Sequence, residues 1–233
     1  MTALYNFTAF AAKSELQEAA AEWIASALRN ALDRRGSAVF MASGGRTPGP
    51  IYDVLSQHEL DWSSVFVGLT DERWVDVDHP ASNGAMVEST LLKGPAAAAE
   101  YVPMKLNGDD PFASIADLND LYMEAGLTDV MLLGMGPDAH TLSWFKGGRG
   151  YESAVDPDTT SIVAAVEAIE SEVTGPNLLR MTLTQPCVAY ARKVLLLITG
   201  EDKKQVFETA APDSPVGIMK TAAGDALTVF YAP

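Results

Sequence analysis

One histidine stands where it could act as a base. His140 lies in the stretch LLGMGPDAHTLSWFKGG, residues 132–148, just after an apolar run that ends in glycines. Imidazole has an ordinary pKa of about 6.5, so it can accept and donate a proton at neutral pH. Asp138, two residues earlier, could orient the ring or bind a hydroxyl group. The alternative is a helix-capping histidine with no chemical role.

The same stretch contains a match to the dinucleotide-binding fingerprint. GMGPDA, residues 134–139, fits G-x-G-x-x-[GA] after a predicted strand. We reject this interpretation because the following KGGRG ends the helix that the fingerprint needs. Pro137 and Asp138 would also occupy positions where a pyrophosphate requires backbone N–H donors.

A glycine-rich turn is a candidate anion site. SGGRTP begins with Ser43, and Gly44 and Gly45 allow a tight turn that exposes N–H groups at the start of a helix. Arg46 adds positive charge and Thr47 adds a hydroxyl group. The spacing and the missing lysine exclude a P-loop. A plain strand-to-helix turn is the alternative.

Charged residues follow two other predicted strands and begin a third. In TDERW, residues 70–74, Asp71 could hold Arg73, which could then meet a substrate oxyanion; a surface ion pair is the alternative. Arg180 opens RMTLT and can bind two oxygens at once. Lys203 falls in the first turn of the helix after TGEDKK, where an ordinary surface lysine is the alternative.

Short apolar runs alternate with helical patterns along the chain. Helices are predicted from Ser14 to Gly36, from Pro48, and over 81–92, 110–126 and 201–211, with a linker at 94–100. Strands are predicted over 37–43, 64–70, 128–136, 161–167, 180–184 (at or near a sheet edge), 191–200 and 226–232. This alternation predicts an α/β fold with a mostly parallel sheet and helices on both faces, in a single domain over 1–233. Ligands bind such sheets beyond the carboxyl ends of the strands, so the loops described above should meet there.

Composition limits the classes of partner. The formal net charge of −15 argues against nucleic acids and anionic membranes, and a local positive cleft is needed for any anionic substrate. The single cysteine, Cys187, cannot form an internal disulfide and suggests a buried structural thiol; no metal or cofactor is expected. No run of eighteen apolar residues and no basic opening segment is present, which predicts a cytoplasmic protein. A monomer or a small homo-oligomer is compatible with the sequence.

Taken together, the loops resemble the 6-phosphogluconolactonase family over about residues 37–210. The stretches that carry the resemblance are SGGRTP, DERWVDVDHPASN, LLGMGPDAHTLSWFKG, RMTLT and TGEDK. The resemblance implies a modified Rossmann-like open sheet, shared with glucosamine-6-phosphate deaminases and ribose-5-phosphate isomerases. It also implies hydrolysis of 6-phospho-D-glucono-1,5-lactone to 6-phospho-D-gluconate, with the SGGRTP turn, Arg180 and Lys203 holding the phosphate.

The resemblance further places Asp71, Arg73 and His140 along the lactone. In the mechanism we expect, His140 removes a proton from water, the water attacks the carbonyl carbon, and the imidazolium protonates the departing ring oxygen. Arg73, with a backbone N–H near Gly44 or Gly136, would stabilise the oxyanion.

The sequence departs from the family pattern at two places. Ala139 stands where the family has glycine in D-G-H, and the usual SLFPG is SWFKG. If position 139 has a positive φ, alanine costs roughly 1 kcal/mol or more there.

Two alternative functions remain. A related deaminase or isomerase is one, but deaminases carry a glutamate five residues after the histidine, where this chain has Phe145. A non-catalytic sugar-phosphate sensor is the other. Sensors of this fold usually add a DNA-binding helical segment, which we do not expect in so acidic a chain.

Overall fold

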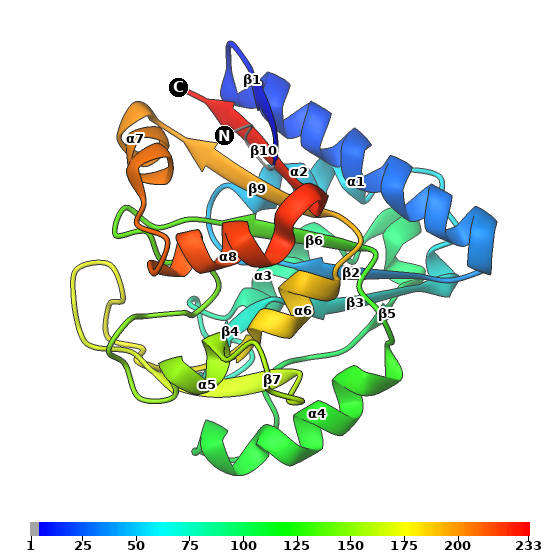
Figure 1. The fold of residues 1–233 in the computed structure, drawn as a ribbon. Coiled ribbons are helices and arrows are strands. Elements are labelled where there is room, and N and C mark those ends of the chain that lie inside the picture. The colour runs from blue at the N-terminus through cyan, green and yellow to red at the C-terminus, as the bar shows by residue number, and fades with distance from the viewer. Residues whose placement is uncertain (1–4) are drawn as a thin grey trace.

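The structure, a computed structural model, describes residues 5–233 and contains a large sheet whose neighbouring strands are all parallel (Figure 1). Its seven strands lie in the order β1-β10-β9-β6-β2-β3-β5. The predicted α/β class is therefore confirmed. The strands are β1 (Asn6–Ala9), β2 (Ala38–Ala42), β3 (Val65–Leu69), β5 (Glu100–Tyr101), β6 (Val130–Gly134), β9 (Val194–Thr199) and β10 (Leu227–Ala232).

The strand order creates a switch point between β2 and β6. From β2 the chain proceeds through β3 to β5 at one edge, then returns to β6 on the other side of β2. The loops after β2 and β6 therefore leave the sheet side by side and lead in opposite directions. In open α/β sheets a ligand crevice forms at such a point.

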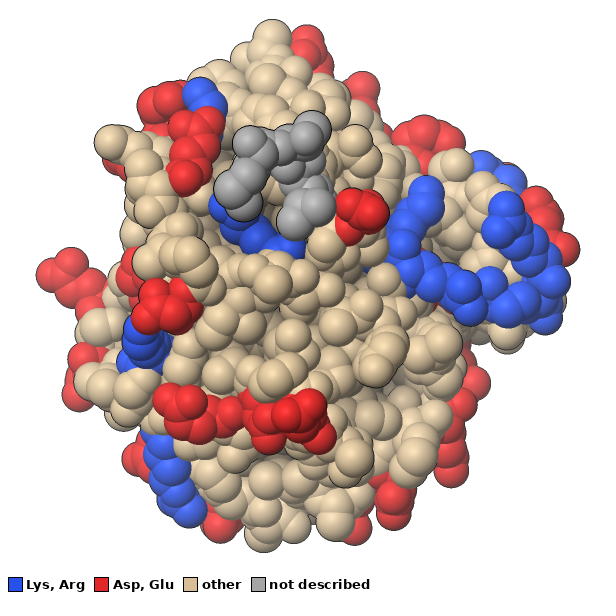
Figure 2. Space-filling model, viewed as in Figure 1, with Lys and Arg blue, Asp and Glu red and all other residues tan. Residues whose placement is uncertain are grey.

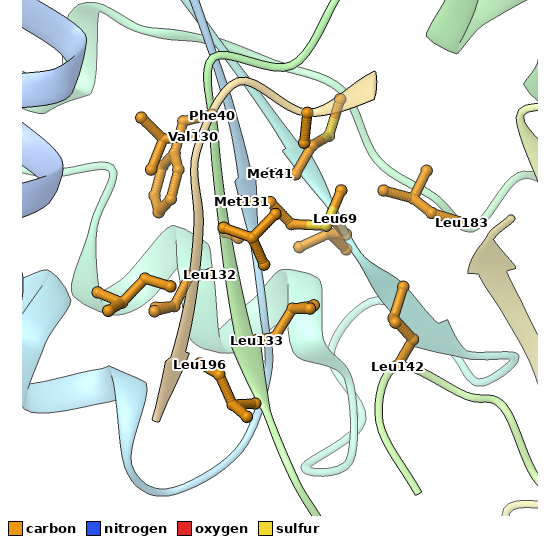
Figure 3. Packing of buried hydrophobic residues seen from close by; sticks show 14 of the residues in the cluster. Phe40, Met41, Leu69, Val130, Met131, Leu132, Leu133, Leu142, Leu183 and Leu196 are labelled. Carbon is orange, nitrogen blue, oxygen red and sulfur yellow. The ribbon is translucent and has the colours of Figure 1, made fainter. Parts of the chain in front are cut away.

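The middle strands are apolar because both of their faces are covered. All five residues of β2 are buried, as are Val130 to Leu133 in β6. Figure 3 shows Phe40, Met131 and Leu196 among the side chains that fill this layer. Strands buried on both faces read as continuous apolar runs, which is why the sequence predicted them correctly.

Helices cover this sheet and connect its strands. α1 packs on α2 and contacts β2, α6 packs on α8, and α4 lies at the bottom of Figure 1 against β7 (Val163–Glu167), a strand of a second sheet. The helices are α1 (Lys13–Arg35), α2 (Pro48–Leu55), α3 (Asn83–Thr90), α4 (Ile115–Glu124), α5 (Tyr151–Val155), α6 (Gln185–Tyr190), α7 (Glu201–Thr209) and α8 (Pro215–Ala223).

The ends of α1 test the predicted helix boundaries. Gly36 ends the helix as predicted, with φ 74° and its N–H bonded to the Leu32 carbonyl. The start differs, because α1 begins at Lys13 after Ala12 and Ser14 lies inside its first turn. Helix ends are the least certain part of a periodic pattern, and no side-chain cap marks this one.

A second, antiparallel sheet corrects two predictions. Its strand order is β4-β8-β7, with β4 (Asp71–Arg73), β8 (Leu179–Leu183) and β7 (Val163–Glu167). The DERW segment was expected to be a loop, but it continues from β3 and pairs with β8. The segment 180–184 was expected near an edge, but β8 is the central strand. Three residues are too few for a period of two to be visible, so the pairing could not be read from β4 itself.

Several shorter elements were not predicted. The expected linker at 94–100 contains the 3₁₀ helix Gly94–Ala98 and the start of β5, and the helices α5, α6 and α8 fall in segments without an assigned pattern. Each is short or begins with proline, so its apolar period is weak. None of the helices within residues 5–233 has the length and apolar character needed to span a membrane.

Surface charge is unevenly distributed on the face in Figure 2. Acidic side chains are spread over the body, whereas basic ones gather at the protruding end of α1 on the right. Arg34 and Arg35 occupy the last turn of that helix, where positive charge complements the helix dipole. Arg35 also pairs with the buried Asp129, so these two arginines have structural roles.

Candidate active site

A cleft of about 460 Å³ opens where the loops after the central strands meet the small sheet. All but one of the residues predicted for the site line this cleft. They are Ser43, Gly44, Gly45, Arg46, Thr47, Asp71, Arg73, Gly136, His140, Arg180 and Lys203. The exception, Asp138, lines a neighbouring pocket of about 370 Å³ that also borders His140. The structure thus brings together residues that are up to 160 positions apart.

His140 is held by the carboxylate beside it. Its Nδ1 lies 2.5 Å from Asp138 Oδ1, and its backbone N–H donates to the same oxygen at 3.3 Å. Burial alone would raise the pKa of Asp138, but the hydrogen bond and the charge of the imidazole lower it overall. A carboxylate on Nδ1 fixes the tautomer that carries its proton there. The ring atom left to act as a base is therefore Nε2, so Asp138 orients the imidazole.

Gly136 makes room for the imidazole. A Cβ at this position would lie 2.1 Å from His140 Cε1, far inside van der Waals contact. The Gly136 N–H donates to the His140 carbonyl at 2.9 Å, which closes the turn. Inside this turn Ala139 has φ 66°, so the family glycine is replaced at a position with left-handed backbone.

The loop 43–47 is built as an open turn. Ser43 is anchored at its base, because its N–H donates to Tyr52 Oη at 2.9 Å and Tyr52 Oη donates to the Ser43 carbonyl at 2.8 Å. Gly45 has φ 101°, a conformation that favours glycine. Within the described residues, the N–H groups of 44–47 have no backbone acceptor. Pro48 and Pro50 lack N–H groups, so among the first three residues of α2 only Gly49 could add a donor to those of the turn.

Lys203 and Arg46 form one pair of cations. Lys203 lies in the first turn of α7 and donates to the Met135 carbonyl at 2.7 Å. Burial lowers the pKa of Lys203, and the positive charge of Arg46 lowers it further. The two side chains therefore lie on the same side of the fold, as the predicted positive cleft required. Arg46 is exposed.

Arg73 and Arg180 form the second pair. They are register partners on β4 and β8. Arg180 is only 5% exposed and donates to the carbonyls of Asn177 and Thr174 at 2.9 and 2.8 Å. Burial lowers the pKa of Arg180 to about 10, with Asp71 opposing the shift and Arg73 adding to it. Arg73 donates to the Ala81 carbonyl at 2.6 Å.

The expected ion pair between Asp71 and Arg73 does not form among the described residues. Asp71 instead accepts a hydrogen bond from Ser143 Oγ at 2.6 Å and one from Thr70 Oγ1 at 3.3 Å. Because Arg73 bonds to a neutral carbonyl, its charge remains uncompensated. Over residues 5–233, none of the four cleft cations Arg46, Arg73, Arg180 and Lys203 is in a salt bridge. The cleft therefore offers positive charge on a negative body.

Two site residues were missed by the sequence analysis. Glu72 is buried and accepts hydrogen bonds from the N–H groups of Arg73, Asn83 and Gly84 at 2.7, 2.8 and 2.7 Å, and from Ser82 Oγ at 3.0 Å. Burial raises the pKa of Glu72, and these bonds oppose that shift. Glu72 ties β4 to the start of α3, so Asn83 reaches the cleft. The sequence signal that could have pointed to Asn83 is the Ser82-Asn83 pair at the start of this helix.

Cys187 lies elsewhere, on a cavity of about 510 Å³ that none of the predicted site residues lines. The thiol is half-buried and donates to the Ile162 carbonyl at 3.3 Å. Burial raises its pKa, which keeps the thiol protonated and unreactive. These contacts support its predicted structural role.

A family model described as "Glucosamine-6-phosphate isomerases/6-phosphogluconolactonase" matches residues 11–227. The chain belongs to this family. The resemblance predicted from the loops is confirmed and extends beyond residues 37–210 to nearly the whole chain. Phe145, at the position where we expected a deaminase to carry a glutamate, has its ring centroid 4.6 Å from that of His140.

Relatives from this family cover the chain almost completely. A 6-phosphogluconolactonase of Rhizobium meliloti (strain 1021) is 37% identical over 235 residues, covering 98% of this chain and 99% of the relative. A 6-phosphogluconolactonase of Neisseria meningitidis serogroup A is 36% identical over 228 residues, covering 94% and 95%. The crystal structure of a 6-phosphogluconolactonase from Shewanella baltica OS155 has a TM-score of 0.87 at 33% identity, covering 98% of each chain.

Proposed function

We propose that this chain is a 6-phosphogluconolactonase, an ester hydrolase that opens 6-phospho-D-glucono-1,5-lactone to 6-phospho-D-gluconate in the pentose phosphate pathway. One observation carries the proposal. An imidazole oriented by a carboxylate and an open glycine turn flanked by cations line the same cleft. The small-molecule sugar phosphate is the expected partner, and we expect the reaction to take place in the cytoplasm.

His140 would act as the base and then as the acid. Nε2 takes a proton from water, and the water oxygen forms a bond to the lactone carbonyl carbon. When the tetrahedral intermediate collapses, the bond from that carbon to the ring oxygen breaks and the imidazolium protonates the ring oxygen. Asp138 stabilises the transient imidazolium through Nδ1, which lies 2.5 Å away.

Arg73 would stabilise the oxyanion. Its guanidinium lines the cleft and is held by the Ala81 carbonyl, so it need not reorganise during the reaction. The sequence suggested a second donor near Gly44 or Gly136. Because the Gly136 N–H is bonded to the His140 carbonyl and the Gly44 N–H belongs to the turn that we assign to the phosphate, we assign the oxyanion to Arg73. Arg180 stands next to Arg73, so we assign it to this end of the cleft.

The substrate phosphate would sit in the turn 43–47. N–H groups without backbone acceptors, the Thr47 hydroxyl and the charges of Arg46 and Lys203 suit a dianion. The phosphate is remote from the reacting carbonyl, so these contacts serve mainly to bind and position the substrate. Phe145 provides no proton carrier for amine chemistry, which favours the lactonase over a deaminase.

The test compares acid release from 6-phosphogluconolactone with ammonia release from glucosamine 6-phosphate. We expect acid release above the spontaneous rate and no ammonia from the wild type. His140→Ala should lower kcat by about 10²–10⁴ without loss of phosphate binding. Ammonia release, or equal lactonase activity in the wild type and His140→Ala, would contradict the proposal.

A further inference from the structure

We propose that Asn83 determines specificity by accepting a hydrogen bond from one ring hydroxyl of the substrate. This inference rests on the proposed lactonase function and adds to it. Asn83 is the first residue of α3 and lines the cleft together with Gly44 and Asp71. It therefore lies beside both the anion turn and the small sheet, where the middle of a substrate anchored at both ends would lie.

The orientation of the Asn83 amide is fixed by its neighbours. Nδ2 donates to the Asp71 carbonyl at 2.8 Å, and the Asn83 backbone N–H donates to Glu72 at 2.8 Å. The residue is 3% exposed. A backbone carbonyl accepts only from the amino end of the amide, so Oδ1 must point the other way.

Gly44 leaves the space that Asn83 occupies. A Cβ at position 44 would lie 1.8 Å from Asn83 Oδ1 and 2.1 Å from its Cγ. Gly45 has a positive φ but Gly44 does not, so left-handed backbone does not explain a glycine at position 44. The need for glycine is instead steric: it brings the Asn83 oxygen onto the backbone of the anion turn.

Oδ1 has the right chemistry for a hydroxyl. Across residues 5–233, no protein donor bonds to it, so its lone pairs remain available in the cleft. An amide oxygen accepts hydrogen bonds but carries no charge, so it can lie beside a phosphate site where a carboxylate would repel the ligand. The phosphate dianion and the lactone carbonyl have no donors. Of the substrate's groups, only the ring hydroxyls can donate to it.

The test measures kcat/KM for the wild type and Asn83→Ala on four substrates: 6-phosphogluconolactone and its three analogues lacking the hydroxyl at C2, C3 or C4. On the parent lactone we expect Asn83→Ala to lower kcat/KM by about tenfold, because the substrate hydroxyl is left without its acceptor. On one of the three analogues the kcat/KM of the variant should lie within about twofold of the wild-type value, because that analogue lacks the hydroxyl that donates to Oδ1.

A matched control separates this role from a structural one. Asn119 also ties loops together, since its Oδ1 accepts the N–H groups of Ile162 and Val163 at 2.6 and 3.1 Å, and it does not line the cleft. Asn119→Ala should show the same preference among the four lactones as the wild type. An equal loss for Asn83→Ala on all four lactones would overturn the proposal.

The proposal stays testable if Asn83→Ala does not fold. The wild type alone should lose about tenfold in kcat/KM on at least one analogue, and equal rates on all four substrates would overturn the inference. Activity of the wild type on the parent lactone is measured first and tests the proposed function separately. A protein active on the parent but indifferent to every hydroxyl retains that function and refutes the role of Asn83.

Discussion

The two cation pairs of the cleft are built on different supports. Arg46 lies in the loop after β2 and is exposed, whereas Lys203 lies in the first turn of α7 after β9 and donates to the Met135 carbonyl. Arg73 and Arg180 face each other across β4 and β8, and their guanidinium groups are tied to backbone carbonyls. Donors held in fixed positions favour transition-state stabilisation, whereas an exposed cation such as Arg46 contributes mainly to ligand capture. The comparison assigns chemistry to the small sheet and anchoring to the segments after β2 and β9.

The pairs also share a feature. In each, burial lowers the pKa of one cation and the second cation lowers it further, with a carboxylate acting in the opposite sense. Like charges that are kept together without a salt bridge lower the stability of the free protein. A bound anion relieves that repulsion. Both ends of the cleft therefore gain from a negatively charged ligand group.

The sharpest test of the comparison removes one cation from each end of the cleft. Arg73→Ala should lower kcat by about 10²–10³, the usual effect of losing one oxyanion donor. Arg46→Ala should raise KM by roughly tenfold and change kcat little. Steady-state kinetics on the lactone, corrected for spontaneous opening, measures both.

The control for this pair is Arg149→Ala, which removes a cation whose partners are Glu167 and the ring of Phe112, outside the cleft. Its kinetics should match the wild type. If Arg46→Ala lowered kcat as much as Arg73→Ala, the division between anchoring and chemistry would be wrong.

Asp138→Asn tests whether the carboxylate beside His140 orients the imidazole. We expect kcat to fall by at least tenfold, because an amide can hold the wrong tautomer of His140. Asp53→Asn is the control, since Asp53 pairs with Lys93 at the surface and lines neither of the two pockets that border His140. Unchanged turnover in Asp138→Asn would remove the orienting role.

The same variant has a predicted pH signature. The pKa of Asp138 is lowered in the folded protein, so its ionised form adds stability above the ordinary carboxyl range. That contribution is lost as the pH falls through the lowered pKa. Denaturant unfolding should show the wild type more stable than Asp138→Asn at pH 7, with the two converging in acid. A constant difference at all pH values would contradict this.

A smaller effect concerns phosphate binding at high pH. Because the pKa of Lys203 is lowered by burial and by Arg46, its charge is lost below the pH at which an ordinary lysine titrates. Affinity for inorganic phosphate, measured by calorimetry, should therefore fall as the pH rises toward 10.5. In Arg46→Ala the decline should begin at higher pH, although the affinity at pH 7 is lower. The same pH dependence in both proteins would show that the cations do not interact.

The two ends of the cleft also differ in how far the sequence could predict their structure. The loops after β2, β6 and β9 follow continuous apolar runs, so their place at one sheet edge followed from the parallel α/β pattern. The small sheet did not follow, because β4 has three residues and pairs with a strand more than 100 positions later. Contacts between such distant segments leave no local period.

The missed residues follow from the same limit. Asn83 and Glu72 act through hydrogen bonds that exist only once α3 lies against β4. Gly44 was read correctly as part of an anion turn, but its contact with the Asn83 amide requires coordinates. Local chemistry identified the groups in the cleft, and tertiary pairing decided which of them are fixed.

The smallest expected effect lies in the backbone of the histidine loop. Ala139 has φ 66°, so Ala139→Gly relieves a left-handed strain of about 1–2 kcal/mol, while the added freedom of the unfolded chain offsets about 0.4–1 kcal/mol. We expect a rise of roughly 0.5–1 kcal/mol in the free energy of unfolding, measured with urea, and kcat within twofold of the wild type. The contrasting variant is Leu142→Gly, because Leu142 has φ 51° but packs in the core (Figure 3), so losing its side chain should cost more than the strain returns. If Ala139→Gly instead destabilised the protein, the methyl group would be packing the loop rather than straining it.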